Sequence, residues 1–277
     1  MAFIPEIWSA NMLVSLKKNL VFGQPGVVNR DYEGEIKDQG DTVRIRSMGR
    51  PTIGTYTKTS TTIVPETLTP AERALYIDQS KYFAFAIDDI DQAQSPGGEL
   101  EETLKEAMYG LRDVADQYVA SLYTGAATAN QLGTVSVTTA ALAYTQLRKL
   151  SVKLDEADVP QEGRWCVVPP WYHGLLLEDD RFVRVDASGT DQGLRNGIVG
   201  RALGFDVMKS NNAPFVTGDD YAVIAGHPMA ISYAEQIAKV ENYRPESGFS
   251  SAVKGLHVYG AKLLRPSALA TCVASQT

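Results

Sequence analysis

The feature that most constrains this chain is a weakly apolar segment, residues 41–87, with clear strand patterns at its two ends. Alternating side chains predict strands that begin at Thr42 and return around Tyr82–Ile87, as the outgoing and returning halves of one long hairpin. The middle is rich in Thr, Pro and Gly and offers little that could form a core. A compact domain rarely keeps such a segment unless something outside the subunit orders it. We therefore expect an arm that packs on a neighbour, with residues 50–72 among the least self-buried.

The residues that follow predict a long amphipathic helix over 99–123. Its apolar side chains recur every three or four residues, as the buried face of a helix requires. They are Leu100, Leu104, Met108, Leu111, Val114, Tyr118 and Leu122. Glutamates crowd the first turn, where the helix dipole stabilises negative charge. At about 1.5 Å per residue the helix would be roughly 35 Å long, enough to anchor the preceding segment.

From Ala140 onward the pattern becomes a mixture of helices and strands. Helices are predicted over 141–157 and 171–177, the second behind Pro170, a favoured position for proline. Strands are predicted over 165–168, 205–210 and 221–225, from 230 onward, and over 256–264, where Pro266 ends the last of them. The fold class expected from this order is α+β.

Composition narrows the class of protein. The chain has 277 residues, 44% of them hydrophobic, enough for a sizeable core. A net charge of −7 argues against a high-affinity nucleic-acid binder, but not against a protein that encloses nucleic acid without gripping it. No apolar run reaches the length of a membrane span, and the first residues lack the pattern of a signal peptide. Cys166 and Cys272 lie in apolar runs and are predicted to be buried free thiols.

Residues that could carry chemistry are sparse. His173 is followed closely by Asp179 and Asp180, and these three side chains define one alternative, a soluble α/β hydrolase-type enzyme using His173. The acidic stretch 88–91 lacks the glycine and terminal glutamate of a calcium loop. The glycines of GIVGRALGF lack the preceding strand that a dinucleotide-binding motif requires. We expect them to shape a loop and a turn. The sequence therefore predicts no catalytic residue, no cofactor and no metal.

Two groups of opposite charge are candidates for contacts between subunits, where charge sets register more than affinity. The basic group lies on the weakly apolar segment and the acidic group on the long helix. The candidates are Arg44, Arg46, Arg50 and Lys58 on the segment, and Glu99, Glu102 and Glu106 on the helix. For any single pair, two ordinary solvated surfaces are the simpler interpretation.

Several motifs spread over nearly the whole chain resemble the major capsid (coat) proteins of tailed bacteriophages, which share the Hong Kong-type capsid fold with encapsulin shells. The motifs are AFIPEIWSA, VVNRDYEGEIKDQGDTV, IDQSKYFAFAIDDID, LRDVADQYVASL, GRWCVVPPWYHGLLLEDDRF, VIAGHPMAISYAEQIAKVENYRPE and VKGLHVYGAKLLRP. They look most like coat proteins of phages of Gram-positive bacteria, especially actinobacteria.

This resemblance implies a division of the chain. It would comprise an N-terminal arm (1–40), an extended loop (41–87), a peripheral domain (88–139) with its spine helix (99–123), an axial domain (140–228), and a return to the peripheral domain (229–277). The extended loop would overlie an adjacent subunit, and the last section would close the peripheral sheet.

The resemblance also implies a function and partners. The protein would self-assemble, as hexamers and pentamers, into an icosahedral head shell in the virion, around double-stranded DNA that it does not bind sequence-specifically. Assembly would take place in the host cytoplasm without a membrane. Because the arm is short and begins at Met1, a separate scaffolding protein, or assembly without proteolysis, is expected, together with portal and decoration proteins. Lys58 has no matching acceptor, so no cross-link is predicted.

Two alternatives to the phage shell remain open at this point. One is an encapsulin-like compartment, whose purified particles would hold protein instead of DNA. The other is the hydrolase-type enzyme described above, in which a change of His173 would remove an activity. Deletion of residues 50–72 separates the shell hypotheses from the enzyme, because it should leave a folded subunit that no longer forms shells.

Overall fold

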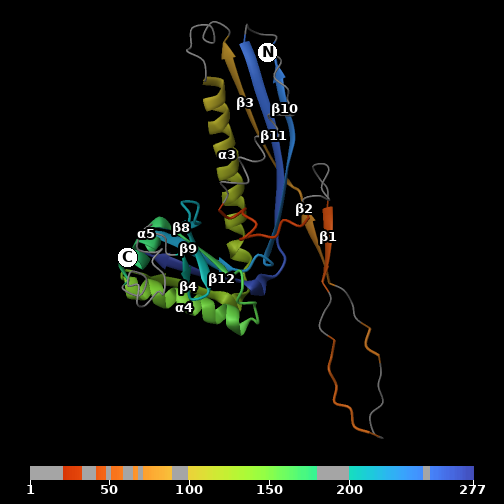
Figure 1. The fold of residues 1–277 in the computed structure, drawn as a ribbon, viewed down its shortest axis with the longest axis vertical. Helices are drawn as coiled ribbons and strands as arrows, with labels where there is room; N and C mark the ends of the chain where they lie inside the picture. Colours follow the sequence, from red (N-terminus) through yellow and green to blue (C-terminus); the bar gives the residue numbers. More distant parts are fainter. Residues whose placement is uncertain are drawn as a thin grey trace.

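The computed structural model describes residues 21–32, 42–47, 51–58, 65–67, 71–88, 99–179, 200–245 and 250–277. Within these ranges the chain is a mixed α+β protein, as expected. A compact body carries an elongated part on one side, and a narrow hairpin projects in another direction (Figure 1). Three sheets, of two, three and seven strands, underlie this shape.

The elongated part is one long helix lying along an antiparallel sheet. Helix α3 (Glu99–Ser121) lies along the strands β3 (Gln79–Asp88) and β11 (Ser250–Leu263) (Figure 1). The strand β10 (Ile231–Tyr243) forms the far edge of this sheet. Part of the predicted stripe packs here, because Leu104, Met108 and Leu111 are buried with Val253 against the rings of Phe83 and Phe85. Val114, which the stripe also included, is instead 40% exposed. The helix predicted over 99–123 is thus confirmed, with residues 122–125 tightening into a 3-10 turn.

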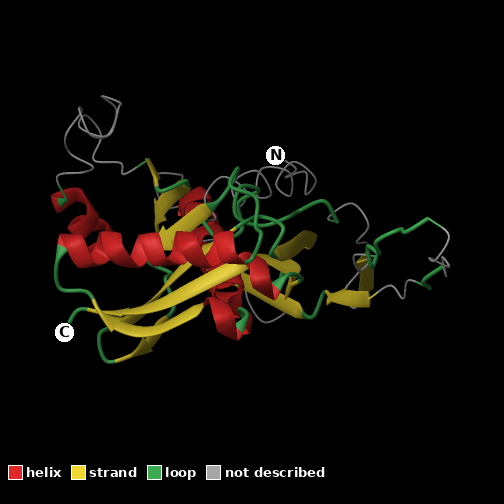
Figure 2. Ribbon diagram, turned by 90° about the horizontal axis from the view of Figure 1, so that it is seen from below, coloured by secondary structure: helices red, strands yellow, loops and turns green. Residues whose placement is uncertain are grey.

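The compact body is built on the seven-stranded sheet. Its strands, in order, are β4 (Gln131–Ser136), β12 (Leu269–Ser275), β9 (Asp220–Gly226), β5 (Trp165–Val168), β7 (Phe205–Lys209) and β6 (Arg201–Ala202), and β8 (Phe215–Thr217) also pairs with β9. Helix α4 (Ala140–Glu156) packs across β12 and β9, and α5 (Pro170–Glu178) packs on α4 (Figure 2). The Tyr172 hydroxyl donates to the Ala143 carbonyl at 2.7 Å and ties the two helices together.

The projecting hairpin corrects one prediction. The strand that returns to β1 (Thr42–Ser47) is β2 (Ala71–Tyr76), paired antiparallel, whereas the predicted return strand at 82–87 belongs to β3 and pairs with β11. The sequence AERALY has no clean alternation, so it gave no strand signal. Leu75 and the following Ile77 are nevertheless buried, and they join Val43 in a small core beside β11. The loop that leaves the hairpin therefore spans residues 48–70.

The end of the chain corrects a second prediction. The strand predicted over 256–264 is the last part of β11 and ends before Pro266, as predicted, but it is not the closing strand. A 3-10 turn at Pro266–Ala268 redirects the chain into β12, which lies between β9 and β4 in the seven-stranded sheet. Residues 229–277 are consequently divided between two sheets. Strand β4, within the unit expected over 88–139, also belongs to the compact body.

The other predicted elements of the compact body are confirmed. They are the helices at 141–157 and 171–177 and the strands at 165–168, 205–210 and 221–225. Gly200 and Gly204 have φ values of 57° and 83° and shape the turns around β6, as expected of loop glycines. Of the N-terminal arm expected over 1–40, only residues 21–32 are among those described.

Candidate intersubunit surfaces

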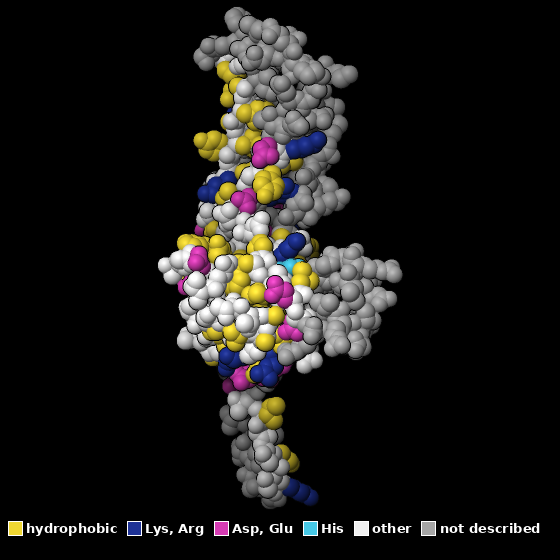
Figure 3. Space-filling model, turned by 90° about the vertical axis from the view of Figure 1, so that its left-hand side faces the viewer, with side chains coloured by type: hydrophobic (Ala, Val, Ile, Leu, Met, Phe, Trp, Pro, Cys, Tyr) yellow, Lys and Arg dark blue, Asp and Glu magenta, His cyan; other side chains and the backbone are white. Residues whose placement is uncertain are grey.

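The loop between β1 and β2 presents its side chains to solvent. Residues 51–58 and 65–67 are all exposed, including two large apolar side chains, Ile53 at 91% and Tyr56 at 66%. The Thr52 N–H donates to Glu66 Oε2 at 2.9 Å, which holds the two sides of the loop together. Figure 3 shows this loop as the narrow projection at the lower end, with isolated hydrophobic side chains and a basic one. The loop therefore presents two large apolar side chains and a basic one to solvent, away from the core of the subunit.

The structure places the predicted charged contacts as follows. Lys58 lies exposed on the loop, and Glu106 lies exposed on α3. Arg44 in β1 is exposed and lies 3.7 Å from Glu72 of the same hairpin. Arg46 also lies in β1, Glu99 and Glu102 lie in the first turn of α3, and Arg50 lies outside the described residues. No pair between the two predicted groups forms within the subunit among the residues described.

Other exposed apolar side chains were not singled out by the sequence. Phe215 and Val216 of β8 are 61% and 41% exposed, and Tyr82 of β3 is 78% exposed. Tyr82 borders a hollow of about 460 Å³ on the three-stranded sheet, together with Leu256 and the exposed pair Lys254–Glu241. The alternation of Tyr82 with Phe83 could have indicated this outward face.

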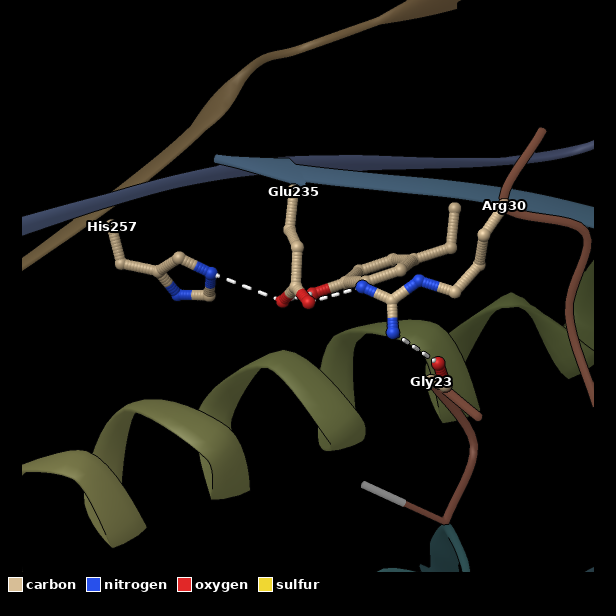
Figure 4. Close-up of polar contacts among 5 residues, drawn as sticks. Gly23, Arg30, Glu235 and His257 are labelled. Atoms are coloured by element: carbon tan, nitrogen blue, oxygen red, sulfur yellow. Dashed lines mark hydrogen bonds and ion pairs between the residues drawn. The ribbon is translucent and has the colours of Figure 1, made fainter. Parts of the chain in front are cut away.

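A buried polar cluster lies where residues 21–32 meet the three-stranded sheet (Figure 4). The Glu235 carboxylate pairs with the Arg30 guanidinium, accepts from the Tyr233 hydroxyl at 2.8 Å, and lies 3.3 Å from His257 Nε2. Arg30 also stacks on the Tyr233 ring and donates from Nη1 to the Gly23 carbonyl at 2.9 Å. Burial alone would raise the pKa of Glu235, but the His257 hydrogen bond and the Arg30 charge lower it to about 2.

A second buried carboxylate lies on α3, about halfway along the molecule. Asp116 Oδ1 accepts from the backbone N–H groups of Val21 (3.0 Å) and Phe22 (2.7 Å), and Oδ2 accepts from Asn212 Nδ2 (3.0 Å). Burial raises the pKa of this carboxyl group, and these hydrogen bonds oppose the shift. The apolar stripe predicted for the helix gave no indication of this buried carboxylate. Its hydrogen-bond partners are distant in the sequence, so only the folded chain shows them.

The two described residues of the enzyme alternative, His173 and Asp179, are both buried. His173 on α5 is only 8% exposed, and burial together with the nearby Lys209 lowers the pKa of its imidazole. Asp179 is buried at the end of the same helix, and Asp180 lies outside the described residues. Cys166 and Cys272 are buried free thiols, as predicted, and burial raises the pKa of both.

Neither a metal-binding cluster nor a membrane-spanning helix occurs among the described residues. No group of His, Cys, Asp and Glu side chains within them has the arrangement needed to hold a metal ion. None of the described helices is both long enough and apolar enough to cross a membrane.

Comparisons with known proteins agree with this emphasis on surfaces. A family model described as phage capsid protein matches residues 72–272. A solved structure from Mycobacterium phage Che8 is 30% identical, covers 93% of this chain and 92% of its own, and superimposes with a TM-score of 0.78. Curated proteins gave no match.

Two more distant structures show the fold alone. The capsid structure of the cyanophage P-SCSP1u is 17% identical over 87% of this chain and 85% of its own, with a TM-score of 0.73. A virus-like particle from Pyrococcus furiosus is 12% identical over 97% and 98% of the two chains, with a TM-score of 0.56.

Proposed function

Because the chain belongs to the phage capsid protein family, we propose that it locks neighbouring subunits of an icosahedral head shell together through the loop at residues 48–70. The protein is a structural, non-enzymatic component of the virion, and it oligomerises to form the head shell. This function replaces the hydrolase alternative based on His173. The described residues of this loop, 51–58 and 65–67, are all exposed.

One observation carries the proposal for the loop. Its described residues are all exposed, and it projects from the hairpin away from both the compact body and the elongated part (Figure 1). Burying Ile53 and Tyr56 against a neighbour would remove apolar surface from water, at about 25 cal/mol per Å². Repeated around a closed shell, many such modest contacts combine through multivalency.

The charged candidates fit the same proposal at the rim of the contact. Lys58 lies on the loop and Glu106 on the exposed side of α3, so the two would meet only across a subunit boundary. Arg44, Arg46, Arg50, Glu99 and Glu102 are proposed for the same role. Rim charges mainly change the rate and register of association. Lys58→Glu should therefore slow assembly, and the difference from the natural protein should shrink as salt is added.

We further assign the parts of the fold to the parts of a capsid subunit. The helix α3 and the three-stranded sheet correspond to the peripheral domain, and the seven-stranded sheet with α4 and α5 corresponds to the axial domain. On this assignment β4 and β12 belong to the axial domain, which moves residues 131–136 and 269–275 out of the peripheral domain expected from the sequence. Hexamers, pentamers, and separate scaffolding, portal and decoration proteins are the partners proposed.

The proposed cargo is double-stranded DNA, held without sequence-specific contacts. The net charge of −7 is consistent with a wall that DNA can slide past, because strong binding would need a basic surface. An encapsulin-like compartment is not proposed, since the 12% identity to the Pyrococcus furiosus particle carries the fold alone. Nuclease-protected DNA in particles purified from infected cells would support the proposed cargo, and its absence would contradict it.

The test of the loop is a replacement that spares the hairpin. Residues 51–67 are exchanged for a short Gly-Ser linker, which leaves the β1–β2 pairing intact, unlike a deletion of 50–72. The variant should retain the circular dichroism spectrum and cooperative melting of a folded subunit, yet form no shells by negative-stain microscopy. Arg148→Ala, at an exposed position of α4 away from the loop, is the control and should assemble. Normal shells from the linker variant would contradict the proposal.

A further inference from the structure

Residues 21–32 connect the elongated part of the molecule to its compact body. Phe22, Val27 and Val28 are at most 1% exposed, and they belong to the core cluster that also contains residues of α3, β10 and the seven-stranded sheet. Asn29 extends the three-stranded sheet locally. Its N–H donates to the Ile231 carbonyl, and its carbonyl accepts from the Tyr233 N–H, both at 2.9 Å.

Two buried carboxylates from different elements hold the two ends of this segment. At its start, Asp116 of α3 accepts from the N–H groups of Val21 and Phe22. At its end, Glu235 of β10 pairs with Arg30 (Figure 4). The side chain of Arg30 is 8% exposed and that of Glu235 is 1% exposed. Arg30 also closes the segment on itself through the Gly23 carbonyl. A buried carboxylate satisfied by several donors fixes geometry strongly, because each donor lost would leave a costly unpaired group.

Asp116 also links α3 directly to the compact body, beside the start of this segment. Asn212, in the turn after β7, donates to the second oxygen of Asp116 at 3.0 Å. A cleft of about 370 Å³ opens beside this contact, between α3 and the turn, and it is lined by Val21, Arg112 and Lys209 among others. The junction is thus incompletely filled, which leaves room for the compact body to change its angle to α3 if these hydrogen bonds are broken.

We propose that residues 21–32 act as a brace that fixes the angle between the compact body and α3. Asp116 holds one end of the brace and the Glu235–Arg30 pair holds the other, with His257 and Tyr233 orienting the Glu235 carboxylate. The brace presents the loop and the compact body to neighbouring subunits in one relative orientation before assembly. This brace is distinct from the loop that is proposed to lock neighbouring subunits together. The brace acts within a single subunit, and its effect can be measured in an unassembled subunit.

The test uses the full-length subunit in unassembled form. Spin labels are placed on exposed positions of the two parts, through Lys105→Cys on α3 and Arg148→Cys on α4, and their distance distribution is measured by electron paramagnetic resonance. The natural cysteines should stay unlabelled, because both are buried and burial raises their pKa. Hydrogen exchange of the Val27, Asn29 and Tyr233 amides reports on the brace itself.

Glu235→Gln is the primary variant, and Glu241→Gln on the same strand is its control, since Glu241 pairs with Lys254 at the exposed surface. Glu235→Gln should increase exchange of the three amides at least tenfold and broaden the distance distribution, whereas Glu241→Gln should change neither. Faster exchange with an unchanged distance distribution would show that the segment does not set the angle. Unchanged exchange and unchanged distances would equally overturn the proposal.

A second pair of variants covers the case in which Glu235→Gln fails to fold. Asn212→Ala removes the hydrogen bond between the compact body and Asp116 at a half-buried position, and the exposed neighbour Asn211→Ala is its control. The first should broaden the distance distribution and the second should not. A narrow distribution in a folded Asn212→Ala subunit, with Glu235→Gln unfolded, would also reject the brace.

Discussion

Glu235 illustrates how one buried side chain can make the subunit sensitive to acid. Its pKa of about 2 lies below the ordinary value of 4.5, because His257, Arg30 and Tyr233 stabilise the ionised form more than burial destabilises it. An acid with a depressed pKa stabilises the folded state fully above its unfolded-state pKa. That contribution is lost as the pH falls towards the folded-state value.

The first prediction concerns this acid dependence. Glu235→Gln should lower the free energy of unfolding by about 3 kcal/mol at neutral pH, since it leaves the Arg30 charge buried without its partner. Between about pH 5 and about pH 2 the stability of the natural protein should fall more steeply than that of the variant. Urea unfolding at a series of pH values measures both. Parallel pH dependences would show that Glu235 is not the group responsible.

Gly260 carries the second prediction at the scale of a residue. A Cβ atom there would lie 2.2 Å from the Tyr76 carbonyl oxygen and 3.0 Å from Ile77 Cα, where the chain passes from β2 to β3. Backbone atoms cannot yield as a flexible side chain can. Gly260→Ala should therefore lower the free energy of unfolding by about 1–3 kcal/mol.

Gly110 provides the matched control for that substitution. It lies on α3, and a Cβ atom added there would meet no neighbouring atom within 4 Å. Gly110→Ala should therefore be neutral or should stabilise the helix by up to about 1 kcal/mol. Thermal melts of the two variants are compared directly. A Gly260→Ala subunit as stable as the natural protein would mean that β2 and β11 can move apart easily.

At the scale of elements, the stability of the elongated part depends on one apolar seam between α3 and its sheet. Leu111 is 6% exposed and packs with Met108, Val253 and the two phenylalanine rings of β3, whereas Val114, one turn on, is 40% exposed. Leu111→Ala should cost about 2–5 kcal/mol. Val114→Ala should stay within about 0.5 kcal/mol. Equal losses in the two variants, by urea unfolding, would contradict the packing of α3 on this sheet.

Local apolar patterns predicted helices that bury one face and one short strand that is buried throughout. Helices α3, α4 and α5 and the strand β5 followed from their apolar patterns. The pattern failed for β2, which lacks alternation, and for β12, whose small apolar side chains are buried on both faces and which follows a proline. Both strands are defined by partners far away in the sequence, which local patterns do not encode.

The candidate functional features also differ in how well the sequence predicts them. The exposed loop was predictable, because a segment poor in apolar side chains cannot form its own core. The buried clusters were not, since Arg30 and Glu235 are 205 residues apart and Asp116 meets Val21 across 95 residues. Only the folded chain brings these groups together, and each by itself reads as an ordinary surface charge.

At the scale of the whole molecule, the subunit combines a rigid interior with a loop that has no packing partner of its own. Among the described residues, the three sheets and α3 bury one large core and two smaller ones, while residues 51–58 and 65–67 are exposed. A shell protein needs this combination, because the fold must form before assembly and the contacts must form during it. The central claim is that the loop at residues 48–70 is ordered by a neighbouring subunit.

The most direct measurement is a cryo-electron microscopy map of assembled shells at a resolution that traces the chain. We expect continuous density for residues 48–70 lying across an adjacent subunit, with Ile53 and Tyr56 buried against it and Lys58 near an acidic side chain of that subunit. A map in which the loop instead folds back on its own sheet, or stays exposed to solvent without touching a neighbour, would contradict the account.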